Sequence, residues 1–188
     1  LEYLRTNIIK ERITKPTDDE RSLKVFNYPF QALEEAVVNA LYHRDYKERE
    51  PVEITIEPDR ISILSYSGPD RSISLESLKE ANMLRSRRYR NRRLGDFLKE
   101  LDLTEGRATG IPTIQKKLRE NGSPKATIET DDSRSYFLID IPARKDFVQD
   151  ADKIRESDIE RIKLNVSKMC PRCVQDMSMN ELGLLAIC

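Results

Sequence analysis

Apolar and polar residues recur with two different periods along the chain, and each period predicts a different kind of element. Between residues 30 and 43 the apolar positions follow the three- and four-residue spacing of a helix that buries one face. Residues 52–56 and 60–66 instead alternate apolar with polar side chains, and the turn between them predicts an antiparallel hairpin. The same criteria predict further helices at 1–13, 74–83, 91–101 and 111–121, and further strands at 23–26, 127–129 and 136–141.

This order of elements predicts an α/β fold of the α+β type. Strands that follow one another through short turns pair in antiparallel fashion, and helices then gather on one face of the sheet. We expect a two-layer sandwich, in which a mixed, mainly antiparallel sheet carries helices on one face. Leu33, Val37 and Leu41 of the 30–43 helix should be buried beneath that sheet.

The pattern divides the chain into three parts. Residues 23–145 hold the predicted sandwich. Residues 1–22, which begin with Leu1 rather than Met, are expected to form a linker helix and loop to an upstream domain. Residues 146–188 are expected to form a C-terminal helical appendage, because the side chains from Asp150 to Leu164 keep helical spacing.

Composition limits the classes of protein that fit. Tryptophan is absent and 35% of the residues are charged, so the core must be built mainly from aliphatic side chains. A formal net charge of zero gives no general attraction to nucleic acids or membranes. No apolar stretch is long enough to span a bilayer and no signal peptide opens the chain, so we expect a cytoplasmic protein without a membrane partner.

The cysteines give no sign of a disulfide framework, because all three follow residue 169. Cys170 and Cys173 have the spacing of half a zinc site. A structural zinc needs four ligands, and only Cys188 and His43 remain in this sequence as further cysteine or histidine. Zinc is therefore not expected, and two reduced thiols are the simpler interpretation.

A polar stripe runs along the 30–43 helix. Glu35, Asn39 and His43 are spaced by four residues, so they stack on one face. A carboxylate can orient or deprotonate a water, and an amide oxygen one turn away can hold a hydrated magnesium ion. The alternative is an ordinary amphipathic helix whose polar stripe faces solvent.

The same stripe carries a resemblance to a known family. Glu35-x-x-x-Asn39 resembles the N-box of the GHKL ATPases, and the longer string from Glu35 to Tyr46 resembles the signature of the RecG-like helicase C-terminal domains and related transcriptional regulators. Those proteins often carry an AlbA/Schlafen-type DNA-binding domain upstream. The resemblance covers roughly residues 20 to 142, and further stretches agree in order: 26–29, 60–63, 90–91 and 109–112.

The resemblance implies roles for individual residues. It makes Glu35 the catalytic group that activates water, and Asn39 the residue that binds magnesium through ATP. His43 would contact a phosphate, or else stabilise the end of the helix against its dipole. A glycine-containing loop before the 111–121 helix would hold phosphate on its backbone amides. The cofactor contacts implied in this way are Asn39, His43, Gly68, Gly106, Thr109 and Gly110.

One element departs from the GHKL pattern. The Asp-x-Gly-x-Gly motif, whose aspartate binds the adenine amino group, aligns with residues 66–70. Tyr66 then stands at the aspartate position and Asp70 at the second glycine, and the Tyr66 ring would fill the space of the adenine. We therefore expect degenerate ATP binding and at most slow hydrolysis. The chain has no Gly-x-x-x-x-Gly-Lys-Ser/Thr loop, which excludes a P-loop helicase motor in this sequence.

Six arginines and no acid lie between residues 85 and 93. They would form a lid on nucleotide phosphates, a contact with a nucleic-acid backbone, or a solvated loop paired with the many acids of the chain. The first two interpretations assign phosphate or nucleic-acid contacts to Arg87, Arg88, Arg90 and Arg92.

Two functional hypotheses follow. The first is a GHKL-like nucleotide-binding regulatory module of a DNA-binding transcriptional regulator, with ATP and magnesium as ligands. The alternative is a scaffold for dimerisation or DNA binding that has lost nucleotide and ATPase activity. In both cases the expected partners are DNA, reached through an upstream domain and the arginine run, and a second copy of the chain.

Overall fold

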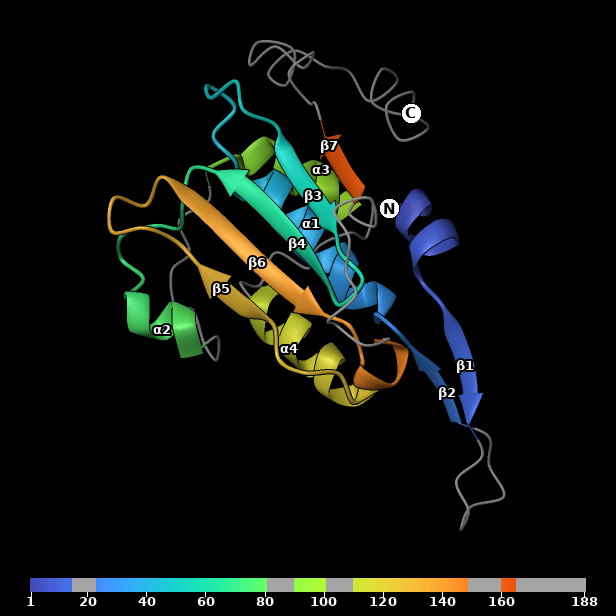
Figure 1. Cartoon of the computed structure of the whole chain (residues 1–188). Coiled ribbons are helices and arrows are strands. Elements are labelled where there is room, and N and C mark those ends of the chain that lie inside the picture. The colour runs from blue at the N-terminus through green and yellow to red at the C-terminus, as the bar shows by residue number, and fades with distance from the viewer. Residues whose placement is uncertain (15–22, 81–89, 101–109, 149–159, 165–188) are drawn as a thin grey trace.

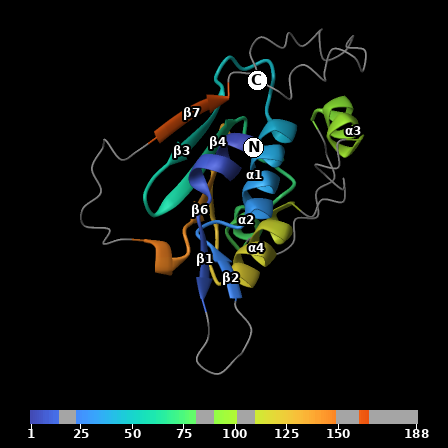
Figure 2. The same cartoon turned by 90° about the vertical axis from the view of Figure 1, so that its right-hand side faces the viewer.

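A five-stranded antiparallel sheet forms the centre of the fold, with the helices on one of its faces (Figures 1 and 2). The computed structural model describes residues 1–14, 23–80, 90–100, 110–148 and 160–164. The strand order is β5-β6-β4-β3-β7. The strands are β3 (Val52–Ile56), β4 (Arg60–Tyr66), β5 (Thr127–Glu129), β6 (Tyr136–Pro142) and β7 (Glu160–Leu164). The predicted fold class is confirmed, and every strand pair in this sheet is antiparallel.

The register of the sheet brings isoleucines together on one face. β4 pairs with β3 so that Ile63 lies opposite Ile54, and it pairs with β6 so that Ile63 also lies opposite Ile139. All three are buried in the main hydrophobic core. Because side chains alternate along a strand, Ser65 faces the helices with these isoleucines, and Tyr66 faces the opposite side of the sheet.

The central helix, α1 (Phe30–His43), lies on the isoleucine face of the sheet (Figure 2). It starts directly after Pro29, whose fixed φ suits the start of a helix. Leu33 and Val37 are buried against the sheet as predicted, whereas Leu41 is only partly buried at the edge of the core. The second helix on this face, α4 (Gly110–Asn121), runs beside α1 and buries Ile114 and Leu118.

Two smaller helices complete the layer. In α3 (Arg92–Glu100), Leu98 forms a small cluster with Val38 and Tyr42 of α1. The helix therefore packs on α1, and Figure 2 shows it on the far side of α1 from the sheet. The short helix α2 (Leu75–Glu80) buries Leu78 and lies near β5.

The N-terminal region contains a strand that the sequence pattern did not predict. A short π-helix, η1 (Leu4–Ile8), precedes β1 (Glu11–Thr14), which pairs with β2 (Leu23–Phe26) in a two-stranded ribbon beside the main sheet. The strand gives little hydrophobic signal, because its single apolar residue, Ile13, is 61% exposed. The expected linker helix and loop over 1–22 is thus partly wrong, and residues 15–22 lie outside the described ranges.

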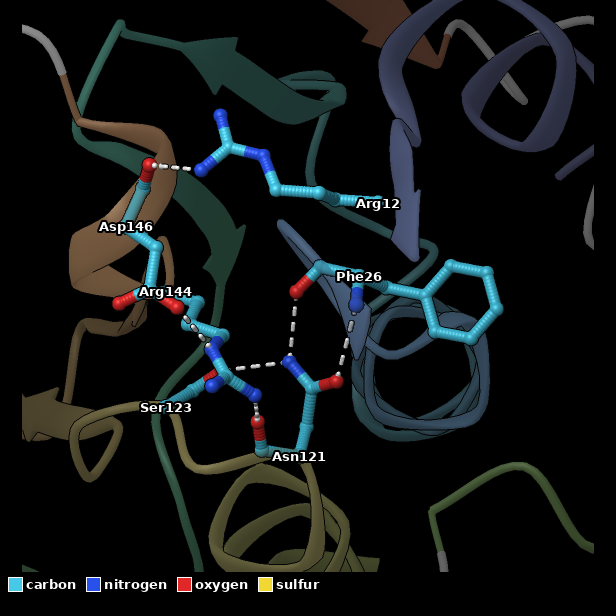
Figure 3. Close-up of polar contacts among 6 residues, drawn as sticks. All are labelled: Arg12, Phe26, Asn121, Ser123, Arg144 and Asp146. Atoms are coloured by element: carbon cyan, nitrogen blue, oxygen red, sulfur yellow. Dashed lines mark hydrogen bonds and ion pairs between the residues drawn. The ribbon is translucent and has the colours of Figure 1, made fainter. Parts of the chain in front are cut away.

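Polar contacts fasten the ribbon to the helical layer (Figure 3). The Asn121 side chain, at the end of α4, donates to the carbonyl oxygen of Phe26 at 2.7 Å and accepts from its amide nitrogen at 3.2 Å. Arg144 donates to the Asn121 carbonyl oxygen at 2.5 Å and pairs with Asp146 at 2.9 Å. Arg12 of β1 donates to the Asp146 carbonyl oxygen at 2.9 Å, so one network joins three separate segments of the chain.

The last described strand corrects a second expectation. Residues 160–164 have helical spacing in the sequence, but they form β7 and pair with β3 from Val52↔Leu164 to Ile56↔Glu160. Without β7, β3 would present an unpaired row of backbone groups at the edge of the sheet. The pairing of these backbone groups depends on the tertiary fold, so the spacing of side chains along residues 160–164 does not predict it. The rest of the tail beyond residue 148, with Cys170 and Cys173, lies outside the described residues.

A search of the described helices for a segment long and apolar enough to cross a membrane found none.

We predict that Asn121→Ala lowers the free energy of unfolding by about 1–3 kcal/mol, since it leaves two backbone groups of Phe26 without their partner. Urea denaturation followed by circular dichroism measures this change. Ser123→Ala is the matched control, because Ser123 accepts only one bond from the same amide, and it should cost less than about 1 kcal/mol. Equal stability of Asn121→Ala and the wild type would show that the ribbon is not fastened in this way.

Candidate functional site

A hollow of about 120 Å³ opens between the end of α1, the end of β4 and the start of α4. We call it the apolar hollow. Polar groups reach it from Asn39 and His43 of α1, from Ser65 of β4, and from the segment that follows β4. Its remaining wall is formed by apolar side chains, among them Ile73, Leu78 and Phe137.

Asn39 is held in the wall of this hollow by two neighbours. Its Nδ2 donates to Glu35 Oε1 at 3.1 Å, which is the contact expected from their four-residue spacing. On its other side, the start of α4 approaches so closely that a Cβ atom on Gly110 would lie 2.2 Å from Asn39 Nδ2. Only glycine fits at position 110 without displacing the amide.

Gly68 has a similar steric role at the end of β4. Its amide nitrogen donates to the carbonyl oxygen of Arg134 at 2.8 Å. A Cβ atom at this position would lie 2.7 Å from the carbonyl oxygens of Arg134 and Tyr136. The glycine thus lets the segment after β4 lie against the turn before β6, and this contact shapes the rim of the hollow.

His43 ends α1 at the edge of the hollow. Its ring stacks on Tyr42, with 5.0 Å between the ring centroids. Arg90 donates to the His43 carbonyl oxygen at 3.1 Å and also to the Ser67 hydroxyl. Desolvation by the surrounding protein atoms, and secondly the charge of Arg90, lower the pKa of His43. Because the residue also keeps contact with solvent, water screens part of both effects.

The end of α1 is fixed by residues that sequence analysis did not single out for this role. Asn91 Nδ2 donates to the carbonyl oxygens of Tyr42 and Arg44, at 2.8 and 2.7 Å. Arg44 is 1% exposed and donates to the carbonyl oxygens of Glu48 and Glu50 at 3.1 and 2.5 Å. The last part of the string from Glu35 to Tyr46 therefore contains Arg44, whose side chain holds the backbone after α1 in place. The signal of Arg44 and Asn91 in the sequence was their place in the family resemblance, Arg44 in the string from Glu35 to Tyr46 and Asn91 in the stretch 90–91.

The remaining predicted residues divide into several groups. Gly106, Thr109, Arg87 and Arg88 lie outside the described residues. Arg92 is exposed at the start of α3 and does not line the hollow. Glu35 does not line it either and acts on it through Asn39.

Two other residues change the interpretation of the region around β4. Tyr66 points away from the helices, so its ring does not fill the apolar hollow and that expectation is wrong. Asp70, which the alignment placed at a glycine position, contributes an acidic group to the wall. Its Oδ1 accepts a bond from the Ser72 amide at 2.9 Å, and this bond helps to shape the segment after β4.

Within the described ranges, no group of three or more His, Cys, Asp and Glu residues lies in an arrangement that could hold a metal ion.

A family model and a solved structure match parts of this chain. Residues 50–139 match the family model described as "Putative ATP-dependent DNA helicase recG C-terminal". The crystal structure of the DIP2311 protein from Corynebacterium diphtheriae is similar, with a TM-score of 0.59 and 23% sequence identity, which supports a shared fold alone. The likeness covers 72% of this chain and 26% of that protein. No match was found among curated proteins.

The family match and the fold agree with the resemblance seen in the sequence. The matched residues contain β4 and the segment after it, α2, α4 and part of β6, which supply most of the lining of the apolar hollow, and α1 completes it from outside the matched range. The match over residues 50–139 therefore supports the resemblance of this part of the chain to RecG-like C-terminal domains of the HATPase type.

Proposed function

We propose that the apolar hollow binds a nucleotide with magnesium, and that the domain is a regulatory module of GHKL type within a DNA-binding transcriptional regulator. The observation that carries the proposal is the position of Asn39. Its amide is held between the Glu35 carboxylate and the first residue of α4, in the wall of a mostly apolar hollow. Packing alone does not require this combination of a cation ligand, a helix N-terminus and an apolar wall.

The polar end of the hollow suits phosphates and their metal ion. α4 starts there with Gly110, and the amide groups of a helix N-terminus favour negative charge. The Asn39 amide oxygen is the kind of ligand that a hydrated magnesium ion takes. These residues fit a magnesium–nucleotide complex, in which the metal would neutralise phosphate charge beside the helix end.

The apolar end suits a planar base. Ile73, Leu78 and Phe137 form a wall on which a ring can pack. Sequence alignment left the adenine contact without a carboxylate, because Tyr66 stands in its place. We assign that contact to Asp70, which lines the same hollow as Ser65 and Ser67. A site of this composition favours a base with a hydrogen-bond donor at its edge.

The arrangement of the site suits nucleotide binding better than it suits hydrolysis. A general base needs to reach the attacking water, and Glu35 is bonded to Asn39 outside the wall of the hollow. Glu35 therefore serves first as a positioning residue for the magnesium ligand. We expect binding with slow or absent turnover, which suits a regulatory module better than a motor.

Calorimetric titration of magnesium–ATP into the purified chain tests the proposal. Asn39→Ala should abolish the magnesium-dependent part of the binding, because it removes the ligand of the metal. Glu35→Gln should leave binding nearly unchanged and remove any residual hydrolysis, because it keeps an acceptor for Asn39 but cannot deprotonate water. Glu34→Gln, one position away on the same helix, is the matched control and should resemble the wild type.

Two results would contradict the proposal. One is the absence of any binding heat with magnesium–ATP at millimolar concentration. The other is binding that does not depend on magnesium and persists unchanged in Asn39→Ala.

His43, the only histidine, gives a second test through its titration. A bound polyphosphate near the ring should raise its pKa from the lowered value, because negative charge favours the imidazolium form. Binding should therefore strengthen as the pH falls towards the pKa of the free protein. NMR of the ring protons with and without magnesium–ATP measures the shift.

Arg90→Gln is the control for this test. In the free protein it should raise the pKa of His43 only in part, since desolvation is the larger cause. An unchanged His43 pKa at saturating magnesium–ATP would place the phosphates elsewhere.

A further inference from the structure

A second hollow, of about 350 Å³, adjoins the first and differs from it in character. The two share Gly68, Pro69 and Asp70 as a common wall. The second is lined mainly by polar residues, which include the three arginines Arg71, Arg90 and Arg134 and the two serines Ser72 and Ser133. We call it the arginine hollow. The sequence assigned Arg90 to the arginine run and gave no role to Arg71 or Arg134.

Charge in the arginine hollow is unbalanced. The three guanidinium groups face one carboxylate among the lining residues, that of Asp70. Asp131, which lies close in sequence, is not part of the lining. Its carboxylate accepts bonds from the Ser133 and Ser135 hydroxyls and from the Ser135 amide, and the first of these bonds contributes most to lowering its pKa to about 2. The lining therefore keeps an excess of two positive charges.

Arg134 shows that this excess is built into the fold. Its Nη2 donates to the Ile73 carbonyl oxygen at 2.7 Å, which fixes the direction of the guanidinium. Its Nη1 is buried and has no hydrogen-bond partner within the described part of the chain. A buried donor without a partner is destabilising, and this destabilisation is removed when an acceptor fills the place.

The backbone at Arg134 is also unusual. Its φ of 60° lies in the left-handed region, and it is the one residue other than glycine with a positive φ among those described. The turn is held by Asp131, whose Oδ1 accepts from the Ser135 amide at 2.6 Å and whose carbonyl oxygen accepts from the Arg134 amide at 3.0 Å. A strained position that carries an unsatisfied cation indicates a functional contact rather than packing.

We propose that the arginine hollow is an anion site that takes a dianionic phosphoryl group, separate from the nucleotide in the apolar hollow. Two negative charges match the excess of the lining, and phosphoryl oxygens suit the planar fork of a guanidinium. Arg134 supplies a buried donor, and Arg71 and Arg90 supply further positive charge in the lining. The site stands whether or not the apolar hollow binds nucleotide, because none of its three cations comes from the nucleotide contacts assigned above.

The chemistry fits two sources, free phosphate and the phosphate group of an ester. Calorimetric titrations with inorganic phosphate and with glycerol phosphate distinguish them, because only the ester adds contacts beyond the phosphoryl group. For whichever probe binds, Arg134→Asn should weaken binding about tenfold or more, as expected for the loss of a charge-assisted bond. Asparagine tolerates a positive φ, so this variant removes the guanidinium and keeps the turn.

Arg71→Gln is a second variant, in which an exposed side chain changes and folding is not at risk. It should weaken binding several-fold and lower its dependence on salt. Arg49→Gln, an exposed arginine that does not line the hollow, is the charge-matched control and should leave binding unchanged. Asn39→Ala should also leave phosphate binding unchanged, so failure of this site and failure of the nucleotide site are distinguishable.

The proposal is overturned by any of three results: neither probe binds at millimolar concentration, Arg134→Asn folds and binds as the wild type does, or Arg49→Gln weakens binding as much as Arg134→Asn.

Discussion

The close approach of α4 to α1 is the constraint on which the site depends. The two helices meet where Gly110 faces Asn39, with no room for a Cβ atom between them. Below that contact, Leu33 of α1 and Leu118 of α4 belong to one core with the isoleucines of β4 and β6. The apolar packing brings the helices together, and the glycine lets the polar amide stay within that packing. The apolar hollow begins where the contact ends.

A second set of contacts fixes the end of α1 from a distant part of the chain. Asn91 binds two carbonyl oxygens at the helix end, and Arg90 binds a third. The buried Arg44 then ties the following loop to the start of β3 through the carbonyl oxygen of Glu50. The signature string thus has two parts. Its first half, with Glu35 and Asn39, shapes the site, and its second half holds the helix that carries them.

Local patterns were sufficient for the parts of the fold whose side chains are buried on one face. The 3.6-residue period predicted α1, and strict alternation predicted β3 and β4, because burial on one side imposes those periods. They failed for β1 and β7, short strands whose place is decided by pairing with a neighbour. Pairing between backbone groups leaves little trace in the side chains.

Candidate site residues could likewise be predicted where local spacing decides their contacts, and not where the tertiary fold does. Asn39 and its contact with Glu35 could be predicted, since both lie on one helix at a fixed spacing. Tyr66 was misplaced because a motif alignment does not say which face of a strand a residue takes, and a shift of one residue reverses the face. Asp70 and Arg134 could not be found from sequence, because the loop after β4 and the turn before β6 meet only in the folded chain.

The central claim, that the apolar hollow is a nucleotide site, is tested most directly by mapping amide chemical shifts during a titration with magnesium–ATP. The account predicts that the largest changes fall on the backbone amides of Gly68 and Gly110 and on the side-chain amide of Asn39. Ser62 and Leu138, on the opposite face of the sheet, should not change. Saturating magnesium–ATP without changes at the first three groups, or with changes centred on the opposite face, would contradict it.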